Sequence, residues 1–91
     1  MSIKGLPFKQ KIQNGFRIRT FSESIEDKEL KWHQDLEDRY VKPLHETDWK
    51  VQLDDELPVD LCTEKEIFIP EGKWHRLIKG SGNLKLQVKF N

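Results

Sequence analysis

The sequence predicts an all-β fold of about eight short antiparallel strands, arranged as a sandwich, barrel or jelly roll. Three observations support this prediction. Apolar and polar residues alternate in several short stretches, turn-forming residues separate these stretches at near-regular spacing, and no strand–helix alternation recurs along the chain. Each strand is therefore expected to bury one face against a shared core.

The N-terminal part of the chain is predicted to form a hairpin. Residues 16–21 alternate in polarity, and Asn14-Gly15 supplies the positive φ values that a two-residue hairpin turn needs. Residues 8–13 are expected to pair back on this strand, so residues 1–15 form an N-terminal arm or hairpin strand. The acidic stretch 22–29 is predicted to be a loop, although Ser24 with Asp27 has the spacing of a helical cap.

The rest of the chain contains the clearest strand signals. Alternation is unbroken from Leu84 to the end of the sequence, and Trp49, Val51 and Leu53 alternate with polar residues. Further strands are expected at residues 30–35, 39–45, 59–62, 66–69 and 74–79. Turns are expected at residues 54–56, 70–72 and 80–83, which are rich in Asp, Pro, Gly, Ser or Asn.

Composition limits the classes of protein to consider. A chain of 91 residues with 35% hydrophobic and 35% charged residues predicts one domain, 1–91, with a thin core. The 16 basic and 16 acidic residues cancel, so neither a nucleic-acid nor a membrane partner is expected. No stretch approaches the ~20 apolar residues of a membrane span. Residues 1–4 lead into no signal-like run, which predicts a cytoplasmic location.

The single cysteine, Cys62, excludes an intrachain disulfide and a cysteine-based zinc cage. Its expected role is that of a small buried or half-buried side chain that fills space in the core.

A candidate metal site follows from a repeated tripeptide. Lys-Trp-His occurs twice, ending at His33 and at His75, and Asp35 follows His33 by two residues. Side chains two apart on a strand share a face, so His33 and Asp35 could hold one ion with His75 returning beside them. Two imidazoles and a carboxylate suit Fe, Mn, Zn or Ni and leave coordination positions open.

Arg39 opens an alternative to metal binding. A guanidinium near Asp35 could replace the cation with an ion pair that satisfies the same buried carboxylate. In a third arrangement, a bulge after Asp35 would turn Glu37 or Asp38 inward, with Arg39 facing a ligand. The sequence leaves these arrangements open.

Two segments resemble the motifs of the cupin superfamily. Residues 69–75, Ile-Pro-Glu-Gly-Lys-Trp-His, resemble the second motif, in which a strand ends at Pro-x-Gly and the next strand begins near a His. Residues 33–40 resemble an altered first motif, with Asp35 in place of a second His and Arg39-Tyr40 where an acidic ligand is usual. The resemblance covers residues 16–90 and implies a very small single-domain cupin, an RmlC-like jelly-roll barrel or double-stranded β-helix.

The resemblance implies a small-molecule-binding protein and leaves two functions open. One is a divalent-metal-dependent enzyme acting on a small polar carboxylate or sugar. The other is a metal-free, non-enzymatic binding or accessory protein that acts as a dimer. In the implied site, His33, Asp35 and His75 hold one divalent metal ion, and Arg39, Tyr40 and Gln52 contact a small anionic or polar ligand.

The order His-x-Asp…His also resembles that of jelly-roll oxygenases that use 2-oxoglutarate. In that family a basic residue about ten positions beyond the distal His grips the co-substrate, and Lys85 stands there in this chain. Lys85 lies within the most regular alternation of the sequence, which favours a solvated strand face instead.

The remaining candidates concern packing and surface. Trp32 and Trp74 precede the candidate ligands and are expected on the opposite side, either packed between layers or forming a homodimer interface. Trp49 is expected in the core, and Arg17 and Arg19 are expected at a basic pocket mouth or on a solvated face.

Overall fold

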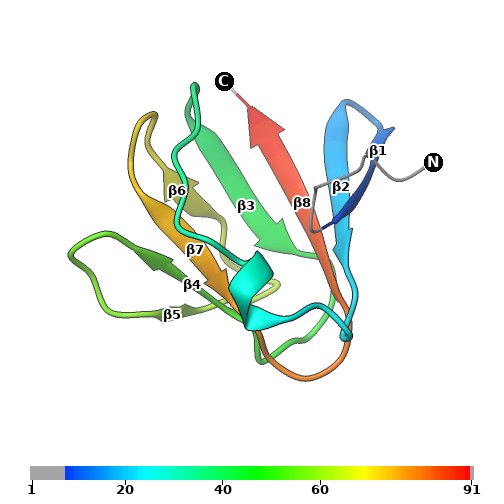
Figure 1. The fold of residues 1–91 in the computed structure, drawn as a ribbon. Helices are drawn as coiled ribbons and strands as arrows, with labels where there is room; N and C mark the ends of the chain where they lie inside the picture. Colours follow the sequence, from blue (N-terminus) through cyan, green and yellow to red (C-terminus); the bar gives the residue numbers. More distant parts are fainter. Residues whose placement is uncertain (1–7, 91) are drawn as a thin grey trace.

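Two antiparallel β-sheets that face each other make up the computed structural model, which describes residues 8–90 (Figure 1). Residues 1–7 of the predicted N-terminal arm lie outside the described part. The five-stranded sheet has the order β1 (Lys9–Gln13), β2 (Phe16–Phe21), β8 (Leu84–Phe90), β3 (Arg39–Pro43), β6 (Ile67–Ile69). The three-stranded sheet has the order β5 (Val59–Asp60), β4 (Lys50–Leu53), β7 (His75–Ile78).

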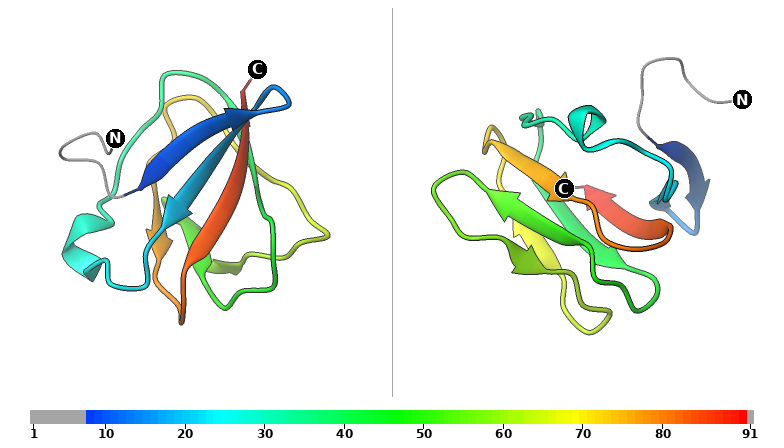
Figure 2. Two further views of the ribbon diagram at one scale, coloured as in Figure 1. Left: turned by 90° about the vertical axis from the view of Figure 1, so that its right-hand side faces the viewer. Right: turned by 60° about the horizontal axis from the view of Figure 1, so that its bottom comes forward.

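The strand pairs bring together segments far apart in the sequence. β8 lies between β2 and β3, and β4 pairs with β7 (Figure 2). All the strand pairs of the described residues are antiparallel, and the two sheets curve around one interior. The predicted all-β jelly-roll architecture is confirmed. Within residues 8–90 no helix is long and apolar enough to span a bilayer.

The predicted N-terminal hairpin is present. Gln13 pairs with Phe16 across a two-residue turn, and the turn residues Asn14 and Gly15 have φ values of 53° and 82°. Both angles lie in the left-handed region that such turns require. β1 therefore becomes the edge strand next to β2, as the Asn-Gly signal indicates.

The core lies between the sheets and follows the alternation of the strands. On β8, the buried Leu84, Leu86 and Val88 alternate with exposed or half-buried polar residues. Trp49, just before β4, is fully buried, and its indole N–H donates to the Gly82 carbonyl at 3.1 Å. Burying a side chain such as Leu84 contributes about 1.5–3 kcal/mol, so these strands supply much of the folding free energy.

The predicted strand at residues 30–35 is wrong. Leu30 and Asp35 are buried, but residues 31–34 between them are exposed. Two positions an odd number apart point to opposite faces of a regular strand, so an extended segment would expose one of them. The chain instead runs irregularly past β7, where His33 and His75 exchange backbone hydrogen bonds of 2.9 and 3.0 Å.

Two smaller predictions also differ from the structure. The acidic stretch contains one 3₁₀ turn, Asp27–Glu29, where a loop was expected. Its cap is Glu26, whose backbone N–H donates to the Glu29 carboxylate at 3.0 Å, and not Ser24. Cys62 is exposed, so its expected role as a core filler is wrong.

Candidate functional site

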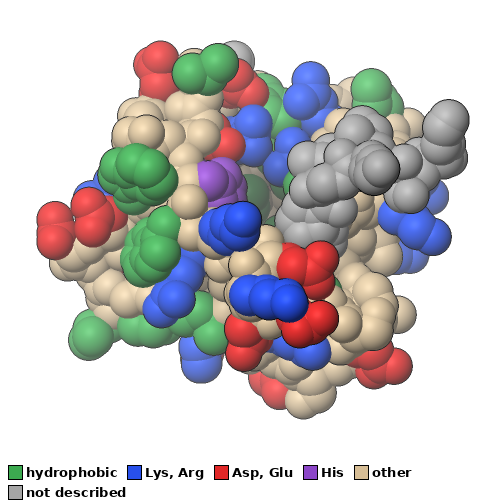
Figure 3. Space-filling view, in the orientation of Figure 1, with side chains coloured by type: hydrophobic (Ala, Val, Ile, Leu, Met, Phe, Trp, Pro, Cys, Tyr) green, Lys and Arg blue, Asp and Glu red, His purple; other side chains and the backbone are tan. Residues whose placement is uncertain are grey.

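A cavity of about 310 Å³ lies between the two sheets. Its walls are mainly apolar and include Phe8, Phe21 and aliphatic side chains from both sheets, such as Val51 and Val88. Polar side chains gather in one part of the lining. In Figure 3 a histidine side chain (purple) lies in a hollow bordered by lysine or arginine side chains (blue). The cavity is thus a mostly apolar space with a localised polar cluster.

The cluster brings together the three predicted metal ligands. One ligand atom each from His33, Asp35 and His75 lies within 4.8 Å of the others. His75 Nε2 is 3.1 Å from Asp35 Oδ2, and His33 Nε2 is 4.0 Å from Asp35 Oδ1. Asp35 and His75 are buried, whereas the His33 side chain is 51% exposed. The ligand atoms therefore converge at the solvent-facing margin of the cavity.

Each imidazole is oriented by the backbone of its own tripeptide. His33 Nδ1 lies 3.0 Å from the Lys31 carbonyl oxygen, and His75 Nδ1 lies 2.8 Å from that of Lys73. A carbonyl oxygen only accepts, so Nδ1 must carry the hydrogen and donate. When a ring oriented in this way is neutral, its Nε2 atom presents a lone pair to the cluster, which is the arrangement of a metal-ligating histidine.

Asp35 has one oxygen that the protein leaves unsatisfied. Oδ2 is buried and has no hydrogen-bond partner among the described residues, although His75 Nε2 is close to it. A buried carboxylate oxygen without a hydrogen bond is costly. A divalent cation between Asp35 Oδ2 and the two Nε2 atoms would satisfy all three. The donor set therefore fits a metal ion.

The protonation states also suit metal binding. Burial alone would raise the pKa of Asp35, but contact with His75 and the charge of Arg39 together hold it below 3.8. Burial lowers the pKa of His33 below 6.5, and the neighbouring His75 acts in the same direction. At neutral pH Asp35 is a carboxylate and His33 is neutral, which are the forms that bind a cation.

Arg39 holds the other oxygen of Asp35. Its Nη1 lies 3.0 Å from Asp35 Oδ1, and its Nη2 lies 3.3 Å from Glu37 Oε1. The predicted Arg–Asp ion pair is therefore present, but it leaves Asp35 Oδ2 beside the imidazoles. Arg39 is placed to orient the carboxylate rather than to occupy the position between the three ligand atoms.

The inward carboxylate is Asp35, and the bulged alternatives are not what the structure shows. Asp38 accepts a hydrogen bond from the Glu71 backbone N–H at 2.8 Å. In the same turn, the Gly72 N–H donates to the Asp35 carbonyl at 2.9 Å, and the Gln34 amide donates to the Gly72 carbonyl at 2.8 Å. The Pro-Glu-Gly turn thus holds Asp35 in place through the backbone.

Tyr40 and Gln52 do not lie beside the cavity, so their expected position is corrected. Tyr40 packs on Phe68 with ring centroids 5.0 Å apart, and the Gln52 side chain accepts hydrogen bonds from Arg76. Each follows a cavity-lining residue on its strand and therefore faces the opposite side of its sheet.

For Arg19 the sequence left open whether the side chain lies at a pocket mouth or on a solvated strand face. It lines the cavity, while Arg17 two positions earlier does not. The available signal was the shared strand face of Arg19 and the buried Phe21. Polarity alone could not show how far along the strand the cavity extends.

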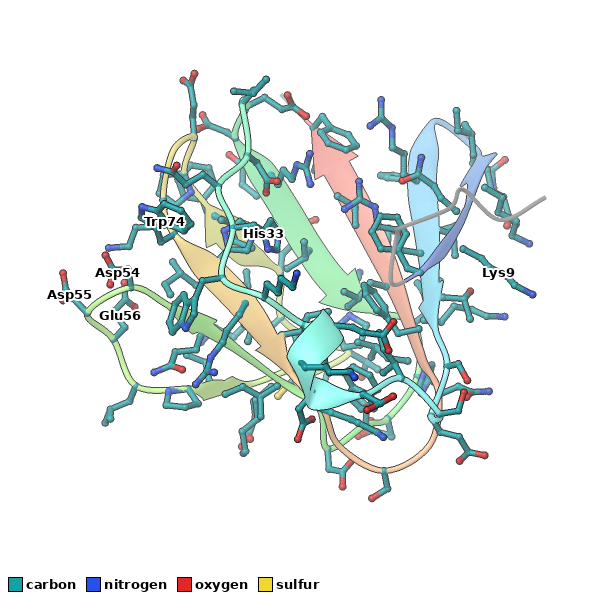
Figure 4. All side chains as sticks on the ribbon, viewed as in Figure 1. Lys9, His33, Asp54, Asp55, Glu56 and Trp74 are labelled. Carbon is teal, nitrogen blue, oxygen red and sulfur yellow. The ribbon has the colours of Figure 1, made fainter. Side chains whose placement is uncertain are left out.

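Trp32 and Trp74 lie away from the cavity, as expected. They are 39% and 45% exposed, and neither lines the space between the sheets. The guanidinium carbon of Arg76 lies 4.8 Å from the Trp32 ring centroid. In Figure 4 the labelled Trp74 lies on the outer side of the loop that carries His33. The two indoles present apolar surface outside the site.

Comparison with known proteins gives matches in structure only. No family model matches the sequence, and no curated protein sequence matches it. The structure is similar to DMSP lyase DddQ from Ruegeria pomeroyi DSS-3, with a TM-score of 0.70 and 13% identity over 84% of this chain. This chain spans 36% of the length of that lyase.

Two further similar structures cover nearly the whole chain. An RmlC-like cupin with a double-stranded β-helix fold from Methanocaldococcus jannaschii has a TM-score of 0.66 and 9% identity, covering 99% of this chain and 85% of that one. A cupin domain from Bordetella pertussis Tohama I has a TM-score of 0.59 and 14% identity, covering 100% and 98%. The chain therefore has the double-stranded β-helix fold of the cupin superfamily.

Proposed function

We propose that this chain is a small-molecule-binding protein whose cavity takes one divalent metal ion and a small ligand. His33 Nε2, Asp35 Oδ2 and His75 Nε2 would hold the ion. The observation that carries the proposal is the buried Oδ2, which has no hydrogen-bond partner among residues 8–90 and lies 3.1 Å from His75 Nε2. Fe, Mn, Zn and Ni all accept this ligand set.

The site supports an enzyme acting on a small polar carboxylate as the function to test first. A bound divalent ion would supply Lewis-acid chemistry toward an oxygen of the ligand. Arg39 fixes the orientation of Asp35, and aliphatic side chains form much of the cavity wall around a bound ligand. The structure of a DMSP lyase is similar in fold, which supports this direction by analogy only.

Elemental analysis of protein purified without chelator or nickel resin tests the metal proposal. We expect near-stoichiometric metal and a melting temperature that falls after EDTA treatment and recovers with one of the four ions. The informative variant is His33→Ala, because this half-exposed side chain contributes little to packing. It should lower metal affinity by about 10–100-fold while the fold stays intact.

The matched control is His45→Ala, which removes an exposed histidine outside the cluster. It should leave metal content unchanged. If the protein carries no metal and its melting temperature responds to none of the ions, the metal proposal is overturned.

A second candidate function rests on the Arg39–Asp35 salt bridge of 3.0 Å. In this alternative the ion pair satisfies Asp35 without a cation, and the chain is a metal-free binding or accessory protein that forms a homodimer. The exposed Trp32 and Trp74 support the dimer, because tryptophan is enriched at interface hot spots. Absence of metal together with a dimeric mass would favour this candidate.

A further inference from the structure

Arg19 on β2 places a second guanidinium in the wall of the cavity. Its Nε donates to the side-chain oxygen of Gln10 at 2.8 Å, and its guanidinium carbon lies 4.4 Å from the centroid of the Phe8 ring. These two contacts fix the plane of the guanidinium without using its terminal nitrogens. Arg19 is therefore held in one orientation at the cavity.

Arg19 differs from Arg39 in having no acidic partner. Arg39 contacts two carboxylates, whereas Arg19 forms no salt bridge within residues 8–90. Its terminal nitrogens also make no hydrogen bond to that part of the protein, and residues 1–7 contain no Asp or Glu. Within residues 8–90, Arg19 thus has no direct ion-pair partner, and the carboxylates of Asp35 and Glu37 act on its charge only from a distance.

The surroundings of Arg19 disfavour an isolated cation. Burial, and after it the positive charge of Arg39, lowers the pKa of Arg19 to about 10. The group is still charged at neutral pH, so an anion that entered the cavity would relieve both effects. A carboxylate could accept two parallel hydrogen bonds from a guanidinium whose plane is already fixed.

We propose that Arg19 is the anion-binding residue of the cavity and that the ligand is a small carboxylate with an apolar body. The carboxylate would bind the terminal nitrogens of Arg19, and the body would pack on Phe8, Phe21 and the aliphatic walls. The inference rests on the proposed small-molecule site but does not require the metal.

Benzoate and benzamide are suitable probes, because they share a ring and nearly a shape but differ in charge. Each is titrated into the ¹⁵N-labelled full chain, and the amide and arginine Nε–H resonances are followed. We expect benzoate to bind at least about tenfold more tightly than benzamide, as a charge-assisted bidentate pair predicts. The Nε–H resonance of Arg19 should shift when benzoate is added and should not shift when benzamide is added. This comparison tests the role of Arg19 in the unaltered protein.

Arg19→Met removes the charge and keeps an unbranched apolar side chain. We expect benzoate affinity to fall about tenfold to the level of benzamide, with benzamide affinity unchanged. The matched control is Arg17→Met on the same strand face, where the guanidinium stacks on Phe90 at 4.0 Å outside the cavity. It should leave benzoate binding unchanged.

Metal content measured on the same samples separates this inference from the metal proposal. Arg19→Met should bind as much metal as the unaltered protein, because Arg19 is not one of the three ligands. Equal binding of benzoate and benzamide, or undiminished benzoate binding by Arg19→Met, would overturn the role of Arg19 alone. Failure of both probes to bind the unaltered protein would overturn the small-molecule site as well.

Discussion

At the scale of single residues, the two oxygens of Asp35 have different surroundings. Oδ1 lies beside Arg39, whereas Oδ2 faces His75 without a hydrogen bond. The spacing His-x-Asp predicted that His33 and Asp35 lie close enough to hold one ion together, and the structure places His33 Nε2 4.0 Å from Asp35 Oδ1. The strand on which that prediction depended is absent, so the side chains converge through the Pro-Glu-Gly turn instead. Contacts of this kind between distant segments produce no periodic pattern in the sequence, so they could not be predicted from it.

Asp48 gives a prediction of pH dependence at this scale. The hydroxyl and backbone N–H of Ser81 each donate to its carboxylate at 2.7 Å. The Ser81 hydroxyl contributes most to holding the pKa of Asp48 below 3.8. A lowered carboxyl pKa stabilises the folded state above its unfolded value, and this stabilisation is lost as the pH falls through the folded value.

Asp48→Asn should therefore lower the free energy of unfolding most at neutral pH. The difference from the unaltered protein should shrink as the pH falls through and below 3.8. Denaturant unfolding at a series of pH values measures this difference. Ser81→Ala, which removes the main donor, should show the same trend, and a difference that stays constant with pH would contradict the assignment.

At the scale of elements, strands were predicted most accurately where apolar and polar residues alternate most regularly. β8 is the central strand of the five-stranded sheet, and its unbroken pattern located it correctly. The two Lys-Trp-His copies show the limit of this approach. The second leads into β7, which pairs with β4, while the first pairs with β7 only at His33. Identical tripeptides adopt different structures because their tertiary partners differ.

Substitutions of two leucines test how much burial on β8 contributes to the free energy of unfolding. Leu84 is fully buried, so Leu84→Ala should lower the free energy of unfolding by about 2–5 kcal/mol through lost burial and a residual cavity. Leu57 is 83% exposed, and Leu57→Ala should change the free energy of unfolding by no more than about 0.5 kcal/mol. Urea denaturation measures both, and similar effects of the two substitutions would contradict the described burial.

At the scale of the whole molecule, the fold encloses its cavity with very few residues. The all-β class and the turn positions could be predicted, because local patterns determine them. The depth of the cavity could not, since it depends on how the two sheets curve toward each other. Arg19 lines the cavity, whereas Gln52 lies outside it, because of that curvature and strand parity. Polarity alone therefore did not separate site residues from solvated ones.

The proposed homodimer belongs to this scale. If Trp32 and Trp74 form its contact, light scattering should give twice the 10.9 kDa chain mass for the unaltered protein. Trp32→Ala should give the monomer mass, because truncation of a hot-spot tryptophan commonly costs more than about 2 kcal/mol. Leu36→Ala is the control, since Leu36 is 89% exposed but is not an aromatic anchor. A mass unaffected by Trp32→Ala would remove the tryptophan interface.

The single backbone bridge between His33 and His75 has a consequence for local motion. Among residues 8–90, it is the one backbone pairing by which the segment around His33 joins β7. Breaking these two backbone hydrogen bonds would release His33 while β4 and β7 remain paired. One imidazole could then leave the cluster without global unfolding. Amide hydrogen exchange at His33 and His75 would then report this opening, and a cation bound by both side chains would slow it.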